Sequence, residues 1–251
     1  MDLKLAEAVL LTSHARLALI TGEPMGLSLE HPLFKYTSSI IFEKDAGQGW
    51  SGPATQVANH PEGWCESLRA SGVGDVALQG GGGIRVTRSD RQWVWQQTMD
   101  LVQPKPADGK IWAVRYREFE LKNVGAPPEV TVEAASARLL EVLQGCESLA
   151  RDAGEAGWAK FFGNALIELT RADSATPQAC QLLPVRGYSA AAHRLLRACD
   201  LAWAFGGMGS WNDLYFDESS HARRYDHLTP QLKAALEGGI LAAAKSEVST
   251  G

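Results

Sequence analysis

The stretch KNVGAPPEV, Lys122 to Val130, separates two parts of the chain that differ in their hydrophobic pattern. It contains the only Pro-Pro pair in the sequence, and proline disfavours helix at its own position and at the residue before it. Short alternating segments precede this stretch, and long helical patterns follow it. We therefore predict an α+β protein with a sheet-containing α+β unit over residues 1–124, a Pro-rich linker over 125–130 and a helical unit over 131–251.

The part before the linker is rich in segments typical of β-strands. Five segments are β-branched or alternate apolar with polar residues: 36–44, 75–79, 84–88, 91–102 and 110–121. This period of two is that of half-buried strands. Because the last four follow one another without intervening helices, we predict an antiparallel sheet. An amphipathic helix at the N-terminus and a short helix over 61–74 are expected to flank it.

The part after the linker has apolar residues at intervals of three and four, which is the helical period. Leu139, Leu143, Cys146 and Ala150 follow this spacing, and three further segments repeat it. Thr229 followed by Pro230 has the composition of an N-cap and a first helical residue, so we predict that the last helix begins there. The expected structure is an all-α unit of four or five helices.

Composition and charge narrow the class of protein. The chain has 251 residues and a formal net charge of -5, without a long basic run, which disfavours binding to nucleic acid. It lacks an apolar run long enough for a membrane span and a signal-peptide pattern, so we expect a cytoplasmic protein that does not interact with membranes. The four cysteines are scattered without a C-x-x-C pair. We therefore predict reduced thiols and no cofactor.

The stretch FGGMGSWND, Phe205 to Asp213, allows two interpretations. Gly206 or Gly207 is well placed to close the preceding helix, and Ser210 with Asp213 forms an S-x-x-D capping box that would open the next one. Alternatively, the free N–H groups of Gly207 to Ser210 would bind an anion. Capping explains more of the residues, because Asp213 would repel an anion and no basic residue lies in the stretch.

An acidic segment follows this stretch. Asp213, Asp217 and His221 are spaced by four residues, so that a continuous helix would place all three on one face. Such a group could hold a metal ion, and the sequence is therefore also compatible with a metal-assisted hydrolase. Arg223 and Arg224 offer ordinary ion-pair partners instead, and a solvated charge network is the favoured interpretation.

Two features of the strand-rich part have similar alternatives. The glycines Gly80–Gly83 lie between strands rather than before a helix, which favours a hairpin turn over a phosphate-binding loop. Trp93 and Trp95 share one face of a strand, and Trp112 lies on the neighbouring strand. They could form an aromatic platform for a ligand or a protein partner, but aromatic residues at this period more often pack into a core.

The segments GEAGWAKFF, Gly154–Phe162, and FGGMGSWNDLYF, Phe205–Phe216, carry a resemblance to a known family. The C-terminal half resembles a family of bacterial proteins catalogued as a domain of unknown function, with a GGMGS-Φ-ND signature in which Φ is aromatic or aliphatic. The resemblance covers about half of the chain, and this sequence departs from it in a long insertion over residues 174–187. It implies no activity and no catalytic residue.

From these observations we predict a non-enzymatic bacterial binding protein without a catalytic residue. An immunity-type protein that neutralises a toxin, or a component of a small defence or signalling assembly, would be of this kind. The expected partner is a protein, for which the acidic charge of the chain favours a basic surface, and a structural oligomer component is a further alternative. The expected binding residues lie in the glycine-rich stretch and the acidic segment after it: Met208, Trp211, Asn212, Asp213, Asp217 and Glu218.

Overall fold

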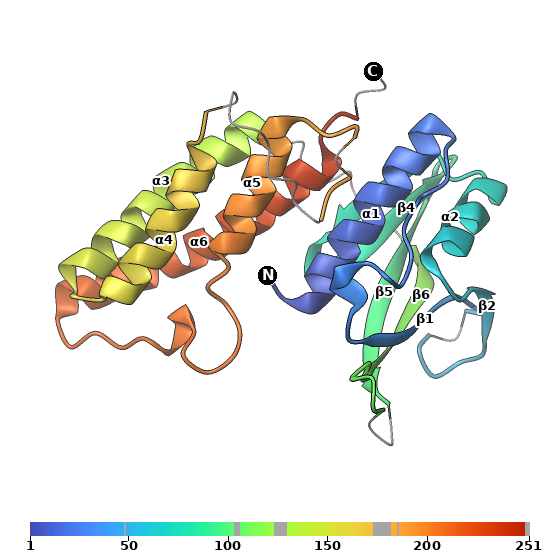
Figure 1. Cartoon of the computed structure of the whole chain (residues 1–251), viewed down its shortest axis with the longest axis horizontal. Coiled ribbons are helices and arrows are strands. Elements are labelled where there is room, and N and C mark those ends of the chain that lie inside the picture. The colour runs from blue at the N-terminus through green and yellow to red at the C-terminus, as the bar shows by residue number, and fades with distance from the viewer. Residues whose placement is uncertain (48, 103–105, 123–129, 173–181, 185, 249–251) are drawn as a thin grey trace. The chain divides into compact units, whose positions relative to one another are not determined.

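The computed structural model describes residues 1–47, 49–102, 106–122, 130–172, 182–184 and 186–248. The chain divides into two compact units, Leu3–Pro127 and Pro128–Ser249 (Figure 1). The first contains the sheet, and the described part of the second consists of helices and loops, so the predicted α+β class is confirmed. Of the predicted linker over 125–130, only Val130 lies within the described residues.

The first unit, called here the sheet unit, contains a six-stranded sheet with the order β2-β1-β6-β5-β4-β3. The strands are β1 (Thr37–Asp45), β2 (Ala54–Ala58), β3 (Asp75–Gln79), β4 (Gly83–Arg88), β5 (Arg91–Leu101) and β6 (Trp112–Leu121). Neighbouring strands from β3 to β6 are antiparallel. However, β1 and β6 are parallel, so the prediction of a purely antiparallel sheet is wrong at this pair. Strands β3 to β6 follow one another along the chain as antiparallel neighbours. Strand β6 then lies beside β1, which is far away in the sequence, so no turn forces these two strands to be antiparallel.

Helices α1 (Leu3–Thr21) and α2 (Pro61–Ala70) cover the same face of this sheet (Figure 1). Trp64 of α2 stacks on Phe42 of β1 with ring centroids 4.9 Å apart, and Trp95 of β5 meets both rings edge-on. Of the three tryptophans that could have formed a platform, Trp95 is therefore a core residue. Trp93 is partly buried beneath the guanidinium of Arg88, and Trp112 is also partly buried.

The N-terminal helix differs from the amphipathic helix expected from the sequence. Every residue from Ala6 to Ser13 is buried, including Glu7. The carboxyl of Glu7 accepts hydrogen bonds from Thr37 of β1 and Gln97 of β5. An acidic residue that would mark the polar face of an isolated helix is therefore part of the core, where its hydrogen bonds reduce the cost of burial.

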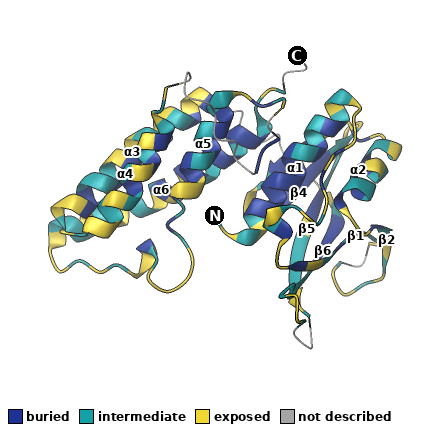
Figure 2. Cartoon of the chain, viewed as in Figure 1, coloured by how far each residue is buried: buried dark blue, intermediate teal, exposed yellow. Residues whose placement is uncertain are grey.

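The second unit, called here the helical unit, contains four α-helices in its described part. These are α3 (Val132–Asp152), α4 (Ala156–Leu169), α5 (Ala190–Leu201) and α6 (Ser219–Lys245). Helix α3 packs against α4 and α6, and α5 packs against α4 and α6. Figure 2 shows that the faces turned toward one another are buried.

The predicted start of the last helix at Thr229 is wrong. Helix α6 begins at Ser219, and Pro230 lies inside it. An internal proline costs about 3 kcal/mol in an isolated helix, but here the turns before it are held by packing. The hydroxyl of Tyr225 donates to the carbonyl of Trp211, and the hydroxyl of Thr229 accepts from the Trp211 indole. Tertiary contacts therefore override the local start signal.

None of the helices in the described part of the chain is both long enough and apolar enough to cross a membrane.

Candidate functional site

The loop from Phe205 to Glu218, called here the corner loop, connects α5 to α6 and contains the glycine-rich stretch. Helix α5 ends at Leu201 and has Ala202 as its C-cap. Neither Gly206 nor Gly207 closes this helix, so that prediction is wrong. Both glycines instead turn the chain within the loop, with φ of 127° and 42°, and a positive φ favours glycine over other residues.

The predicted capping box between Ser210 and Asp213 is present. The Asp213 carboxylate accepts a hydrogen bond from the N–H of Ser210 at 3.0 Å. This box opens only the short 3-10 helix η3 (Trp211–Asp213) rather than a long helix. The chain then leaves the helical conformation until α6 begins, so the capping box stabilises the loop itself.

Trp211 anchors the corner loop to the helices. Its side chain is fully buried, and its ring lies 5.0 Å from the ring of Phe162 and 5.3 Å from that of Trp158, measured between centroids. The indole N–H donates to the hydroxyl of Thr229 at 2.9 Å. Trp211, one of the predicted binding residues, therefore supports the loop from inside and offers no surface to a partner.

The remaining predicted binding residues lie on the outside of the same loop. Met208 is fully exposed, with a relative accessibility of 104%, and Asn212, Asp213, Asp217 and Glu218 are also exposed. The structure adds Tyr215, which is 84% exposed. The sequence alone did not single out Tyr215, because an aromatic residue beside Leu214 and Phe216 is as easily assigned to the core.

The three metal-ligand candidates do not lie on one helical face. Asp213 belongs to η3, Asp217 lies in the connection, and His221 lies in the first turn of α6. The imidazole of His221 is instead 3.3 Å from the carboxylate of Glu218. Across the described ranges, no group of three or more His, Cys, Asp or Glu side chains is arranged to hold a metal ion. The continuous helix assumed for a hydrolase site is therefore absent at these residues, because the chain turns between η3 and α6.

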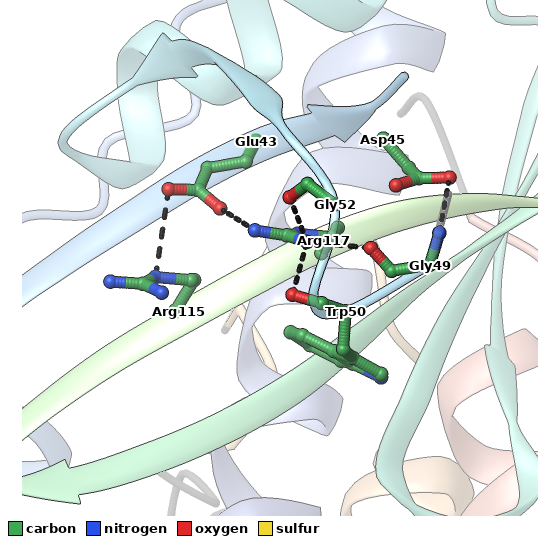
Figure 3. Close-up of polar contacts among 7 residues, drawn as sticks. All are labelled: Glu43, Asp45, Gly49, Trp50, Gly52, Arg115 and Arg117. Atoms are coloured by element: carbon green, nitrogen blue, oxygen red, sulfur yellow. Dashed lines mark hydrogen bonds and ion pairs between the residues drawn. The ribbon is translucent and has the colours of Figure 1, made fainter. Parts of the chain in front are cut away.

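A second candidate site lies in the sheet unit, on the sheet face opposite α1 and α2. Arg117 of β6 holds the loop between β1 and β2 by three hydrogen bonds and forms a fourth to Glu43 of β1 (Figure 3). Its guanidinium donates to the carbonyl oxygens of Gly49, Trp50 and Gly52 at 2.8, 2.7 and 3.3 Å, and to Glu43 at 3.0 Å. The Arg117 side chain is only 6% exposed, so these bonds are shielded from water and define the shape of the loop.

Trp50 is the side chain that this loop presents. Its ring packs against Phe119 at 5.2 Å and lies 5.4 Å from the Arg117 guanidinium. It remains 39% exposed and borders a hollow of about 230 Å³. The glycine turn at Gly80 and Gly81, Lys4 of α1 and Gln96 of β5 also border this hollow. The glycine turn forms a hairpin, in agreement with the favoured interpretation of the sequence.

Two of the buried cysteine thiols are poorly suited to act as nucleophiles. Burial raises the pKa of the Cys65 thiol to about 11 and that of the Cys146 thiol to about 12. Both thiols therefore remain protonated at neutral pH, and the thiolate is the reactive form.

Neither the family models, nor the curated proteins, nor the solved structures that were compared with this chain yield a match.

Proposed function

We propose that this protein is a non-enzymatic binding protein that docks a protein partner on the corner loop. A toxin neutralised by an immunity-type protein, or another member of a small assembly, is a partner of this kind. The observation that carries the proposal is the exposure of Met208 and Tyr215 on a loop whose centre, Trp211, is buried. Methionine and tyrosine are common anchor residues at protein interfaces.

Preorganisation of the loop supports this role. The capping box and the buried indole restrain the middle of the loop, which lowers the cost of ordering it on binding. Neighbouring exposed apolar side chains with a polar rim are a common feature of protein interfaces. A loop that is anchored from inside by Trp211 and presents Met208 and Tyr215 outside has the properties of an interface.

The charge around the two apolar side chains indicates the kind of partner. Residues 205–218 contain three acidic side chains, Asp213, Asp217 and Glu218, and no lysine or arginine. A complementary surface has an apolar socket for Met208 and Tyr215 with basic residues around it.

The test is affinity capture from lysate of the source cells with the full-length tagged chain, followed by binding measurements with the captured partner. We expect one stoichiometric partner whose affinity falls by about 30-fold or more in the double variant Met208→Ala/Tyr215→Ala, since interface hot spots contribute about 2 kcal/mol or more.

The matched control is Ile167→Ala, because Ile167 is an exposed apolar residue (69%) on α4 of the same unit. This variant should bind as the wild type does. Recovery of no stoichiometric partner, or equal affinity of the wild type and the double variant, would refute the proposal.

A further inference from the structure

Among the described residues, one half of strand β5 has no neighbouring strand on its outer side. Strand β4 pairs with β5 only from Arg91 to Trp95, whereas β5 continues to Leu101. On the other side, the segment Gln96–Leu101 pairs fully with β6. The sheet therefore has a step at which β4 ends and the edge of β5 becomes open.

The register of the β5–β6 pair defines which backbone groups point to this open edge. The N–H of Val102 donates to the carbonyl of Ile111 on the β6 side. In an antiparallel ladder every second residue directs both of its backbone groups to the same neighbour. Gln97, Met99 and Leu101 therefore direct their N–H and C=O groups to the open edge. In the described part of the chain, no other segment forms a backbone hydrogen bond with them there.

The hollow of about 230 Å³ lies at the inner end of this open edge, where the turn between β3 and β4 begins. Gly80 and Gly81 form its wall, and Gly81 has φ 77° and ψ 14°. A β-carbon added at either glycine would meet no atom within 4 Å, so their backbone faces open space. Lys4 is the only charged residue among the described residues that line the hollow.

The geometry points to a binding site for the C-terminal segment of a peptide, which we propose adds to β5 as an antiparallel strand. A peptide strand placed beyond the N-terminal end of β4 runs antiparallel to β5, from Leu101 toward Gln97. Its C-terminus then reaches Gly83, the first residue of β4. Its terminal carboxylate then lies in the hollow, beside the Lys4 ammonium and the backbone of the glycine turn. A peptide that ran parallel to β5 would instead place its N-terminal amine in the hollow, where the Lys4 ammonium would repel it.

Strand addition and carboxylate capture complement each other here. The backbone hydrogen bonds give affinity with little dependence on sequence, and the carboxylate fixes the register because the hollow is closed by β4. Successive glycine N–H groups near an αL residue are a common anion-binding arrangement. This site lies in the sheet unit and shares no residue with the corner loop, so it is independent of the function proposed above.

The test uses the full-length chain and a phage library that displays random peptides of about seven residues with free C-termini. We expect enrichment of peptides with a shared pattern in their last positions. Synthetic versions should bind at least about tenfold more weakly when the terminal carboxylate is amidated, because a charge-assisted contact is lost. Absence of enrichment, or equal binding of amidated and free peptides, would overturn the proposal.

Two variants separate the two parts of the site. Lys4→Gln should weaken free peptides but leave amidated peptides unchanged, whereas Lys122→Gln, an exposed lysine beyond the far end of β6, should change neither. Met99→Pro removes an N–H that points to the open edge and therefore no hydrogen bond to β6. Proline is tolerated where the N–H of an edge strand faces solvent. This variant should weaken both kinds of peptide.

Unchanged binding in both Lys4→Gln and Met99→Pro would also overturn the proposal. If Met99→Pro fails to fold, the question is decided by whether Lys4→Gln weakens the binding of free peptides but not that of amidated peptides. The corner-loop variant Met208→Ala/Tyr215→Ala should retain peptide binding, which distinguishes failure of this site from failure of the corner loop.

Discussion

Glu7 lies in the core of the sheet unit, and burial raises the pKa of its carboxyl to about 7. Hydrogen bonds from Thr37 and Gln97 act in the opposite direction but do not offset burial. Tyr116, which is also fully buried, has a pKa well above its ordinary value, first because of burial and second because of Glu7. The interior of this unit therefore favours the protonated form of both side chains.

We expect the stability of the protein to fall as the pH rises from about 4.5 to about 7 because of Glu7. Over this range the folded state retains a proton that the unfolded state has lost, so the free energy of unfolding decreases, and it levels off above pH 7. The loss contributed by this group is on the order of 3 kcal/mol.

Denaturant titrations across this pH range should show that Glu7→Gln removes most of the decrease. Glu66→Gln, at an exposed glutamate on α2, should leave it unchanged. A decrease of the same size in Glu7→Gln and the wild type would contradict the assignment.

Thr229 has a different role from the N-cap that its sequence context predicted. Its hydroxyl accepts the indole N–H of the buried Trp211. Thr229→Val keeps the shape of the side chain but leaves this donor without a partner, so we expect a loss of about 1–3 kcal/mol in the free energy of unfolding. Thr229→Ser keeps the acceptor and should lose less. Equal stability of all three proteins in denaturant unfolding would show that the hydrogen bond contributes nothing.

At the scale of secondary-structure elements, close approach of helices depends on individual glycines. Helices α5 and α6 meet at Gly239, where an added β-carbon would lie 2.6 Å from the sulfur of Cys199 and 3.2 Å from a methyl carbon of Leu195. The neighbouring Gly238 has no atom within 4 Å of the same position. The close approach of α5 and α6 therefore requires glycine at position 239 but not at position 238.

We expect Gly239→Ala to destabilise the protein by about 1–3 kcal/mol, because the helices must move apart. Gly238→Ala should instead stabilise it by up to about 1 kcal/mol, because alanine is the better helix former. Thermal unfolding of the two variants checks both signs. A stabilised Gly239→Ala would mean that the α5–α6 contact is looser than the structure shows.

The loop between β1 and β2 depends on a single arginine. The Arg117 side chain is only 6% exposed, and Arg117→Met leaves Glu43 and three carbonyl groups without this donor (Figure 3). We expect a loss of about 3 kcal/mol in the free energy of unfolding and faster proteolysis of the loop.

Arg115→Met is the matched control, because Arg115 is 44% exposed and lies 3.5 Å from the same Glu43 carboxylate. An exposed ion pair contributes less than about 1 kcal/mol. Similar losses in both variants would assign the stability to the Glu43 charge rather than to the Arg117 hydrogen bonds.

At the scale of the whole molecule, the net charge of -5 acts on any partner before contact. If the partner of the corner loop is basic, its association rate should fall by about an order of magnitude between low and high salt, because the ions screen the attraction.

Stopped-flow association at several salt concentrations checks this expectation. Asp217→Asn with Glu218→Gln should reduce the salt dependence, whereas Glu133→Gln, an exposed glutamate at the start of α3, should reduce it less. A rate independent of salt would exclude a basic partner surface.

Patterns that extend over a few residues were predictable from the sequence. The period of two before Lys122 and the helical period after Val130 predicted the α+β class, since both periods are properties of a single element. The capping box of Ser210 and Asp213 was predictable for the same reason, because its donor and acceptor are three residues apart.

Only the tertiary structure decided which of these residues are buried and which distant segments meet. The parallel pair of β1 and β6, the burial of Glu7 and Trp211, and the helix that continues through Pro230 all depend on contacts between residues far apart in sequence. The open edge of β5 likewise follows from the unequal lengths of paired strands. Local propensities of residues other than glycine and proline amount to fractions of a kcal/mol per residue, whereas burying one large side chain contributes about 1.5–3 kcal/mol. Where the two conflicted in this protein, packing prevailed.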